Sequence, residues 1–423
     1  MRKTMPFPRG HIPPLARIKQ NLPTDHIEDV YGEVRKQLVD SGLRDKIKQG
    51  SRIAITAGSR GMGGFVQLLK GISDAVKSMG GEPLIIPAMG SHGGATSEGQ
   101  VEILERLRVT QSSIGAPIEA TMETQALGTS KTGAIAHLDD IAARVDGIIV
   151  LGRTKTHPEN KEGIASGLLK MVTVGLGKQK GAQEAHTHGL WPSVVAVPEL
   201  TMANAKIVCG VAVVENGFRQ AVEIEIVPAT YAAFKDSDER LLQRAKPYVA
   251  DIPFQQLDVL IVDELGKNIS GTGMDLNVIG NWRMTGGDHE PDFRRIVVLS
   301  LTRESLGNGL GIGLADFTTQ RFVDEYDEAV TYVNLLTATE PGTINTVEGP
   351  LPLALRSDQE AIEVGIFSAL TSDRPRVCRI KNTACLDQLW VSEALLPEVE
   401  KEDQLTVIDK IAPLEFDREG NLF

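Results

Sequence analysis

Short apolar runs alternate with stretches of helical spacing along most of the chain. The short runs, which predict strands, are 52–56, 83–88, 147–151, 206–214, 257–262, 295–301 and 376–380. The stretches in which apolar residues recur every three or four positions, which predict helices, are 25–49, 65–79, 98–107 and 317–335. Strands that alternate with helices are typical of βα units around a largely parallel sheet. The pattern therefore predicts an α/β fold.

A polar stretch that contains prolines, 235–253, interrupts this rhythm and is the best candidate for a domain boundary. We expect two α/β domains with largely parallel sheets. The first spans 1–254 and the second 255–423. Ligand sites in such proteins commonly lie between domains, so we expect an active-site crevice between the two.

The composition excludes several classes of protein. Lys and Arg number 44 and Asp and Glu 56, and the net charge of −12 argues against a nucleic-acid binder. No apolar run approaches the roughly 20 residues that span a bilayer, and the first residues lack the apolar centre of a secretory signal. The three cysteines, Cys209, Cys378 and Cys385, have no zinc-site spacing and suit a reducing compartment. We expect a cytoplasmic protein with neither nucleic-acid nor membrane partners.

Charged or titratable side chains follow three of the predicted strands. They are Arg60 in the glycine-rich loop 57–64, His92 in 89–94 and His157 in 152–158. The carboxyl ends of parallel strands converge on the ligand crevice, so we expect these three side chains to be neighbours. A lone loop histidine is more often a surface or capping residue. Two histidines and an arginine at equivalent positions indicate a site where the imidazoles act as acid and base.

The loop 58–64 can hold a phosphate with its backbone N–H groups, although its glycine spacing is not that of a dinucleotide fingerprint. The segment 175–179 resembles a phosphate-binding loop only superficially, because Gln179 stands where Ser or Thr is required. The alternative for both segments is a tight turn.

A lysine and a histidine pair follow in the same predicted domain. Lys170 comes directly after an apolar pair, and a desolvated amine has a lowered pKa and is nucleophilic. Alternatively, its stem covers apolar surface while the amine reaches water. His186 and His188 suggest a metal site, the alternative being one ligand or capping histidine with an exposed neighbour.

In the second domain, the segment 263–275 follows a predicted strand and includes Lys267. Its polar groups can hold a carboxylate or sugar hydroxyls. A glycine-rich turn without a ligand explains the same residues equally well.

In this order the motifs resemble those of the nickel-dependent lactate racemase family, the nickel-pincer 2-hydroxyacid racemases and epimerases. The likeness rests on 58–60 (GSR), 90–92 (GSH) and 156–157 (TH), and then on Lys170 and His186, which are sixteen residues apart. It covers most of the first domain, 1–254, and, more loosely, the second. The resemblance implies that the first domain is the cofactor-binding and catalytic domain.

The resemblance implies an isomerase that uses nickel and a nickel-pincer nucleotide, the pyridinium-3-thioamide-5-thiocarboxylic acid mononucleotide. Lys170 would hold this cofactor through a thioamide, and His186 would be a nickel ligand beside the cofactor's sulfur atoms. His92 and His157 would exchange the substrate's hydroxyl proton, one for each stereoisomer, and Arg60 would stabilise developing charge. The further cofactor-binding candidates are Ser59, Gly61, Gly63 and Lys267.

Such a cofactor accepts a hydride from a 2-hydroxy acid and returns it to the other face. The expected partners are therefore a small hydroxyacid and the enzymes that mature the cofactor. Ala57 stands where the family usually has an acid, and Leu169 where it has an arginine. The spacing from His157 to Lys170 is a few residues longer than in lactate racemase. These departures fit a larger polyhydroxy acid, such as a sugar acid. A nucleotide-cofactor oxidoreductase and a non-catalytic hydroxyacid-binding relative remain alternatives.

Overall fold

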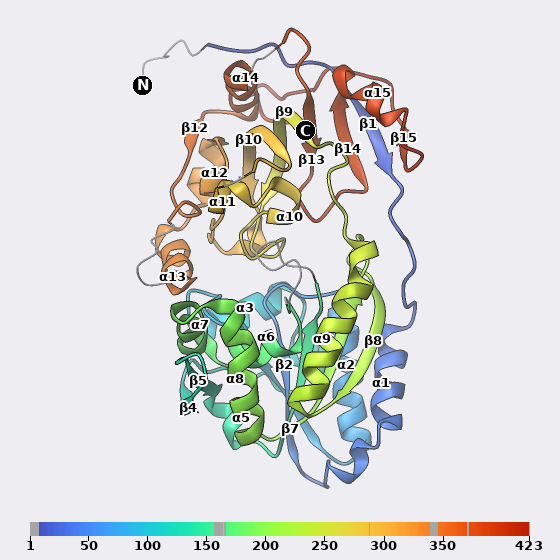
Figure 1. The fold of residues 1–423 in the computed structure, drawn as a ribbon, viewed down its shortest axis with the longest axis vertical. Helices are drawn as coiled ribbons and strands as arrows, with labels where there is room; N and C mark the ends of the chain where they lie inside the picture. The colour runs from blue at the N-terminus through green and yellow to red at the C-terminus, as the bar shows by residue number, and fades with distance from the viewer. Residues whose placement is uncertain are drawn as a thin grey trace. The chain divides into compact units, whose positions relative to one another are not determined.

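The computed structural model describes residues 8–155, 164, 166–286, 288–338, 346–369 and 372–422. The chain divides into two compact units (Figure 1). We call Pro23–Val249 with Tyr332–Ile344 the N-terminal unit, and Met1–Leu22 with Ala250–Thr331 and Asn345–Phe423 the C-terminal unit. The division at Val249 lies close to the boundary expected near 255. Two segments join the other unit: Met1–Leu22, from the start of the first expected domain, and Tyr332–Ile344, from within the second.

The N-terminal unit is built on a five-stranded sheet in the order β3-β2-β6-β7-β8. Its strands are β2 Arg52–Ala57, β3 Glu82–Pro87, β6 Gly147–Arg153, β7 Ile207–Glu215 and β8 Ala221–Pro228. All neighbours are parallel except β7 and β8, which form an antiparallel pair. A separate hairpin pairs β4 Thr124–Thr129 with β5 Ile135–Asp139.

Helices cover both faces of this sheet. Ile53 and Ile55 of β2 face a core with the helices α1 and α2, whereas Ala54 between them belongs to the core on the other face. This alternation follows from the two-residue period of a strand. The helices are α1 Val30–Asp40, α2 Phe65–Ser78, α3 Ser97–Arg106, α4 Gln111–Ile114, α5 Asp140–Arg144, α6 Leu168–Lys170, α7 Lys178–Thr187, α8 Leu190–Asn204 and α9 Tyr231–Ala245. Short helical turns are η1 Leu43–Asp45, η2 Met171–Gly175 and η3 Lys246–Tyr248.

The C-terminal unit holds an eight-stranded sheet in the order β12-β11-β10-β9-β13-β14-β1-β15. Its strands are β1 Leu15–Gln20, β9 Gln256–Leu265, β10 Asp292–Leu301, β11 Phe317–Thr319, β12 Leu353–Leu355, β13 Val377–Ile380, β14 Gln388–Ser392 and β15 Leu405–Val407. The first five strands in the spatial order are parallel, and β14, β1 and β15 extend the sheet antiparallel. The predicted α/β fold with largely parallel sheets is thus confirmed.

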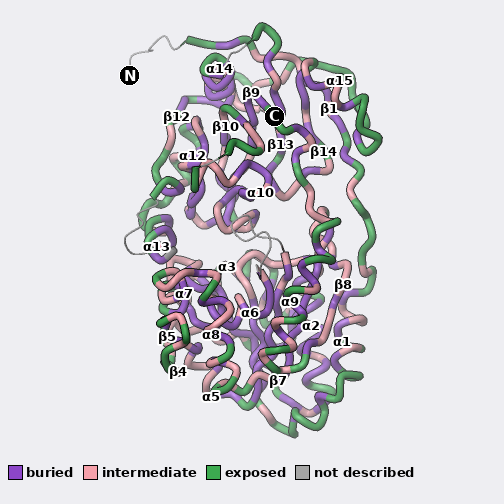
Figure 2. Tube along the Cα trace, in the orientation of Figure 1, coloured by how far each residue is buried: buried purple, intermediate pink, exposed green. Residues whose placement is uncertain are grey.

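Short helices and turns surround this second sheet. They are α10 Leu276–Ile279, α11 Trp282–Thr285, η4 Arg303–Ser305, η5 Ile312–Leu314, α12 Gln320–Glu325, α14 Asp358–Ala369, η6 Glu393–Leu395 and α15 Leu396–Val399. Helix α13, Glu328–Ala338, begins in the C-terminal unit and continues into the N-terminal unit from Tyr332. Buried positions follow the strands and the inward faces of the helices (Figure 2). No helix in the described part of the chain has the length and apolarity that a membrane span requires.

Three sequence-based elements differ from the structure. The helix expected over 317–335 is divided into β11, α12 and α13, because Thr318 and Thr319 are buried in a strand and Thr319 caps α12. The helix expected over 25–49 is shorter, since Asp29 caps α1 and Ser41 ends it. The stretch 235–253, expected as a boundary, begins inside α9.

Candidate active site

The predicted loops begin at one edge of the N-terminal sheet. β2 is parallel to both β3 and β6, so the chain leaves all three strands at their common carboxyl edge. Arg60 lies in the loop after β2 and His92 in the loop after β3, both half-buried. His157 lies outside the described residues.

The first loop is attached to β6, β7 and the turn after β7. The N–H of Gly63 donates to Glu215, which also pairs with Arg153 at 2.7 Å. Burial alone would raise the pKa of Glu215, but Arg153 and the Gly63 N–H lower it below its usual value. Arg219 donates to the carbonyl of Arg60 at 2.8 Å. These contacts hold the backbone at Arg60 and Gly63 in place.

Ser59 and Gly61 lie in the same loop and are half-buried, whereas Gly63 is buried. Ala57, which precedes them, is fully buried in the core that faces α1 and α2. The position where the resemblance expects an acid is therefore a core position in this chain.

The second loop turns tightly over the start of α3. Gly93 has φ +70°, and a Cβ there would lie 2.5 Å from the backbone carbon of Gly99, so this turn requires glycine. The buried side chain of Gln100 donates to the carbonyls of Gly90 and His92, at 3.0 and 3.3 Å. His92 is thus held through its own backbone.

Lys170 ends the short helix α6, whose start is capped from α9. Asp238 accepts hydrogen bonds from the N–H groups of Leu168 and Leu169, at 2.8 and 2.9 Å. Burial raises the pKa of Asp238 to about 6, although these two N–H groups oppose the rise. A Cβ at Gly167 would lie 2.2 Å from the carboxylate, so the close approach of Asp238 depends on glycine there.

The amine of Lys170 lies over the ring of Trp191, 5.0 Å from its centroid. Lys170 is half-buried. Its neighbour Met171 extends toward the first loop, where a methyl group on Gly58 would lie 3.9 Å from Met171 Cε. Lys170 therefore belongs to the same region as the loop that carries Arg60.

A π-helical turn, η2, joins α6 to α7, which carries His186. Burial and, to a smaller extent, the nearby charge of Lys170 lower the pKa of His186 to about 4. The structure thus brings Lys170 and His186 within electrostatic reach of each other. A neutral imidazole is the form that binds metals.

His188 has a different environment. Its Nδ1 lies 3.0 Å from the carbonyl of Glu184, at the end of α7. The capping alternative therefore describes His188.

Two buried polar residues at this edge had no strong sequence signal. Lys178 is fully buried and pairs with the fully buried Asp139 at 3.0 Å. Thr154, buried directly after β6, has a hydroxyl without a hydrogen-bond partner among the described residues. The segment 175–179 resembles a phosphate-binding loop superficially, but its lysine, Lys178, forms an internal ion pair.

Lys267 belongs to the C-terminal unit, in the loop after β9. It is buried, its N–H donates to Ser305 at 2.9 Å and its amine donates to the carbonyl of Gly271. Its part in cofactor binding stays a prediction.

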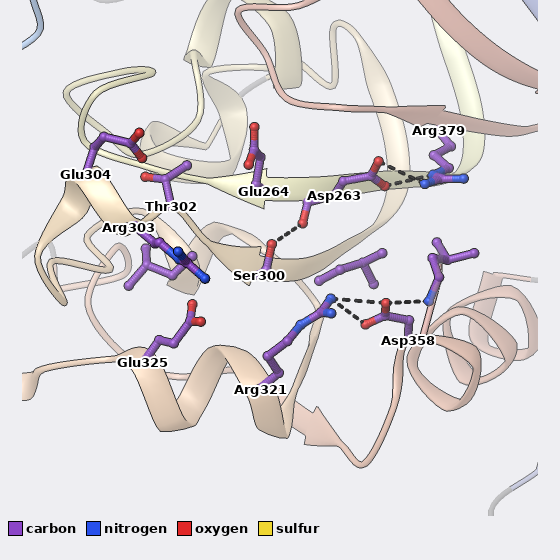
Figure 3. A pocket seen from close by; sticks show the side chains of 13 residues that line it. Asp263, Glu264, Ser300, Thr302, Arg303, Glu304, Arg321, Glu325, Asp358 and Arg379 are labelled. Carbon is purple, nitrogen blue, oxygen red and sulfur yellow. Dashed lines mark hydrogen bonds and ion pairs between the residues drawn. The ribbon is translucent and has the colours of Figure 1, made fainter. Parts of the chain in front are cut away.

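The C-terminal unit has its own polar pocket of about 430 Å³ at the carboxyl ends of β9 and β10 (Figure 3). Asp263, predicted as a polar loop residue, lines it and forms a two-pronged pair with Arg379 at 2.8 and 3.0 Å. Burial raises the pKa of Asp263, and Arg379 opposes the rise.

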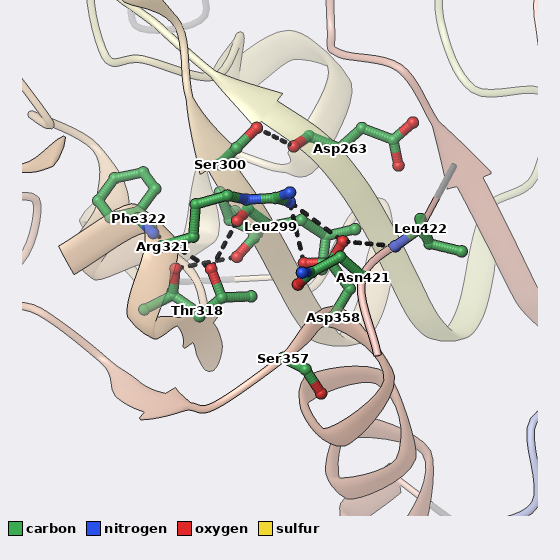
Figure 4. Close-up of polar contacts among 12 residues, drawn as sticks. Asp263, Leu299, Ser300, Thr318, Arg321, Phe322, Ser357, Asp358, Asn421 and Leu422 are labelled. Carbon is green, nitrogen blue, oxygen red and sulfur yellow. Dashed lines mark hydrogen bonds and ion pairs between the residues drawn. The ribbon is translucent and has the colours of Figure 1, made fainter. Parts of the chain in front are cut away.

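A second ion pair lies across the same pocket (Figure 4). Arg321 of α12 donates to both oxygens of Asp358, the first residue of α14, at 2.9 and 3.1 Å. The N–H of Leu422 donates to the same carboxylate at 2.9 Å, which attaches the end of the chain to this pocket. The lining therefore combines arginines with carboxylates.

No group of three or more His, Cys, Asp and Glu side chains in the described part of the chain is arranged to hold a metal ion. A metal ion at His186 would therefore need other ligands than a group of three such side chains.

No protein-family model matches the chain, and no curated protein matches its sequence. Among solved structures, the lactate racemase apoprotein from Thermoanaerobacterium thermosaccharolyticum is similar, with 11% sequence identity and a TM-score of 0.50. The likeness covers 88% of this chain and 99% of that one. At this identity it shows a shared fold.

Proposed function

We propose that the protein is a racemase or 2-epimerase of 2-hydroxy acids that uses a nickel-pincer nucleotide. The observation that carries the proposal is the placement of Lys170 beside a half-buried His186 with a lowered pKa, next to the loop after β2. The fold shared with a lactate racemase apoprotein supports it.

The residues fit such a cofactor. Lys170 would hold it through the side-chain amine, and His186 would ligate the metal as a neutral imidazole. When bound, the cofactor supplies a hydride acceptor. Thr154 offers a buried hydroxyl with no partner among the described residues, which a polar group of a ligand would satisfy. Ser59 and Gly61 would bind the phosphate through the loop at the start of α2, whereas the N–H of Gly63 already donates to Glu215, so Gly63 would only shape this loop.

His92 and Arg60 would act on the substrate itself. His92 would remove or return the proton of the 2-hydroxyl group on one face, with His157 as its counterpart on the other. Arg60 would stabilise the negative charge that develops on the oxygen. Ala57 adds no acid to this group, so we expect a substrate other than lactate, with a sugar acid as the first class to assay.

The test is nickel content and intact mass after expression together with cofactor-maturation enzymes. Wild type should contain nickel, with added mass on the peptide that carries Lys170. His186→Ala should lose nickel, and Lys170→Ala should lose the added mass. His188→Ala is the matched control and should keep both. Nickel retained in His186→Ala would refute the metal assignment.

The assay for the reaction is the change of configuration at C2 of lactate and of gluconate. Reduction of added NAD or NADP by the metal-free protein would instead indicate the oxidoreductase. Binding of gluconate without any change at C2, in protein that contains nickel, would indicate a non-catalytic relative.

A further inference from the structure

A buried glutamine supports the loop that carries His92. Gln100 of α3 is fully buried, and its side-chain NH₂ group donates to the carbonyls of Gly90 and His92 at 3.0 and 3.3 Å. One amide group therefore contacts the loop after β3 on both sides of Ser91, whose hydroxyl accepts a further hydrogen bond from Asn334 at 3.2 Å.

Lys178 fixes which way this amide points. Its amine lies 3.2 Å from Oε1 of Gln100 and also donates to the carbonyl of Pro87, the last residue of β3. A lysine amine only donates hydrogen bonds, so the amide oxygen must face it. The NH₂ group must then face the two loop carbonyls.

Asp139 holds the lysine in place. Its Oδ2 lies 3.0 Å from the amine of Lys178, and its Oδ1 caps α5 by accepting from Ile141 and Ala142 at 2.8 and 3.0 Å. Both charges are fully buried, and each compensates the other for the water it has lost. Because Lys178 is the first residue of α7, this chain of contacts begins on the helix that carries His186.

We propose that Gln100 and Lys178 are positioning residues that set the location of His92 relative to α7. They act through the backbone of the loop and do not take part in the reaction. The chemical part of this inference, the role of His92 as acid and base, rests on the proposed function.

The test measures hydrogen exchange of the amides of 89–94 and the NMR signal of the His92 ring, assigned with His92→Gln. In Gln100→Met we expect exchange of these amides to rise about tenfold or more, the effect of losing one to two hydrogen bonds, and the His92 signal to shift. Gln100→Glu keeps an acceptor toward Lys178 and loses both donations, so it should behave like Gln100→Met.

Two matched controls exist in the same unit. Gln37 of α1 donates to the carbonyl of Ile224 at 3.0 Å, and Lys206 donates to that of Val145 at 3.0 Å. Gln37→Met and Lys206→Met should leave the exchange of 89–94 and the His92 signal unchanged. Lys178→Met should raise the exchange of 89–94 and shift the His92 signal as the Gln100 variants do. If Lys178→Met does not fold, the two Gln100 variants alone test the proposal.

Unchanged exchange and an unchanged His92 signal in folded Gln100→Met would overturn the proposal. So would faster exchange spread evenly over the N-terminal unit, because that would indicate a purely structural role. Neither measurement needs nickel or turnover. A failed nickel test therefore refutes the proposed function and leaves the positioning result intact.

Discussion

At the scale of single residues, the groups around Lys170 have protonation states set by burial. His186 has a pKa lowered to about 4 by burial and by Lys170, whereas burial raises the pKa of Asp238 to about 6. Neutral pH thus leaves the imidazole uncharged and the carboxylate charged. An uncharged imidazole can bind a metal without first releasing a proton.

We expect the His186 imidazole to stay neutral as the pH falls from 8 to about 5 and to protonate near pH 4. Its pKa is lower in the folded chain than in the unfolded one. Its contribution to stability is therefore present above the ordinary histidine pKa of about 6.5 and is lost as the pH falls toward 4. NMR of the ¹⁵N-labelled imidazoles, without metal, measures this. Lys170→Met should raise the pKa of His186 yet keep it below the ordinary value, because burial is the larger cause. Titration near 6.5 in wild type would contradict the expectation.

Asp238→Ala should destabilise the protein by about 2 kcal/mol or more, since two buried N–H groups at the start of α6 lose their acceptor. Thermal unfolding measures the effect. Its neighbour Ser237 is the control, because its buried hydroxyl has no partner among the described residues. Ser237→Ala should leave the stability of the protein unchanged or raise it slightly. Equal losses in both variants would show that the packing of α9, and not the cap, matters.

At the scale of elements, the edge of the N-terminal sheet is held together by side chains from one strand to the next. Arg153 ends β6, Glu215 ends β7, and Gly63 belongs to the loop after β2; one carboxylate connects all three. Both side chains of the pair are largely buried, with 15% and 8% of their surface exposed. The loop that carries Arg60 therefore depends on a buried ion pair.

Glu215→Ala should cost about 3–5 kcal/mol, because it leaves the Arg153 guanidinium buried without its partner. Replacing both, as Arg153→Met with Glu215→Leu, should recover most of that loss. Urea unfolding of both single variants and the double variant measures the coupling. If the double variant loses as much unfolding free energy as the two single variants together, the ion pair is not the source of the stability.

The elements that the sequence predicted correctly are those with a strong local pattern. The runs at 52–56, 83–88 and 147–151 are strands buried on both faces, and they read as continuous apolar segments. The strand β8 did not stand out, because its intermediate and exposed positions interrupt the apolar run. The strand β15 has only three residues, and β1 mixes apolar with charged residues. Both pair with residues far away in the sequence.

The residues of the candidate site likewise divide into those that the sequence could predict and those that it could not. The topological rule for strand ends located Arg60 and His92, and the structure places both at the expected edge. Asp238 and Gln100 could not be found, because each acts through a partner that only folding brings near. His157 stays a prediction.

At the scale of the whole molecule, the two units have separate hydrophobic cores. The apolar clusters of the N-terminal sheet contain Ile53 and Leu168, and the clusters of the C-terminal sheet contain Ile18 and Leu260. Units with separate cores open separately in exchange experiments.

Ile18→Ala should cost the C-terminal unit about 2–5 kcal/mol, because Ile18 is fully buried in β1. We expect faster hydrogen exchange in β9 and β10 and unchanged exchange in β2 and β6. Lys19→Ala, at the exposed position beside it, is the control and should change neither. Equal acceleration in both units would show that they unfold as one.

The position of β1 also affects the order of events during synthesis. β1 lies between β14 and β15, although it ends at Gln20 and β14 begins only at Gln388. At about 5–20 residues per second, a ribosome needs on the order of 20 to 70 seconds to make the intervening chain. Most of the N-terminal unit emerges during that interval and can fold first, while β1 waits without its partners. The first strand among the described residues is therefore among the last to be paired, and residues 15–20 are the strand that stays unpaired for the longest time during synthesis.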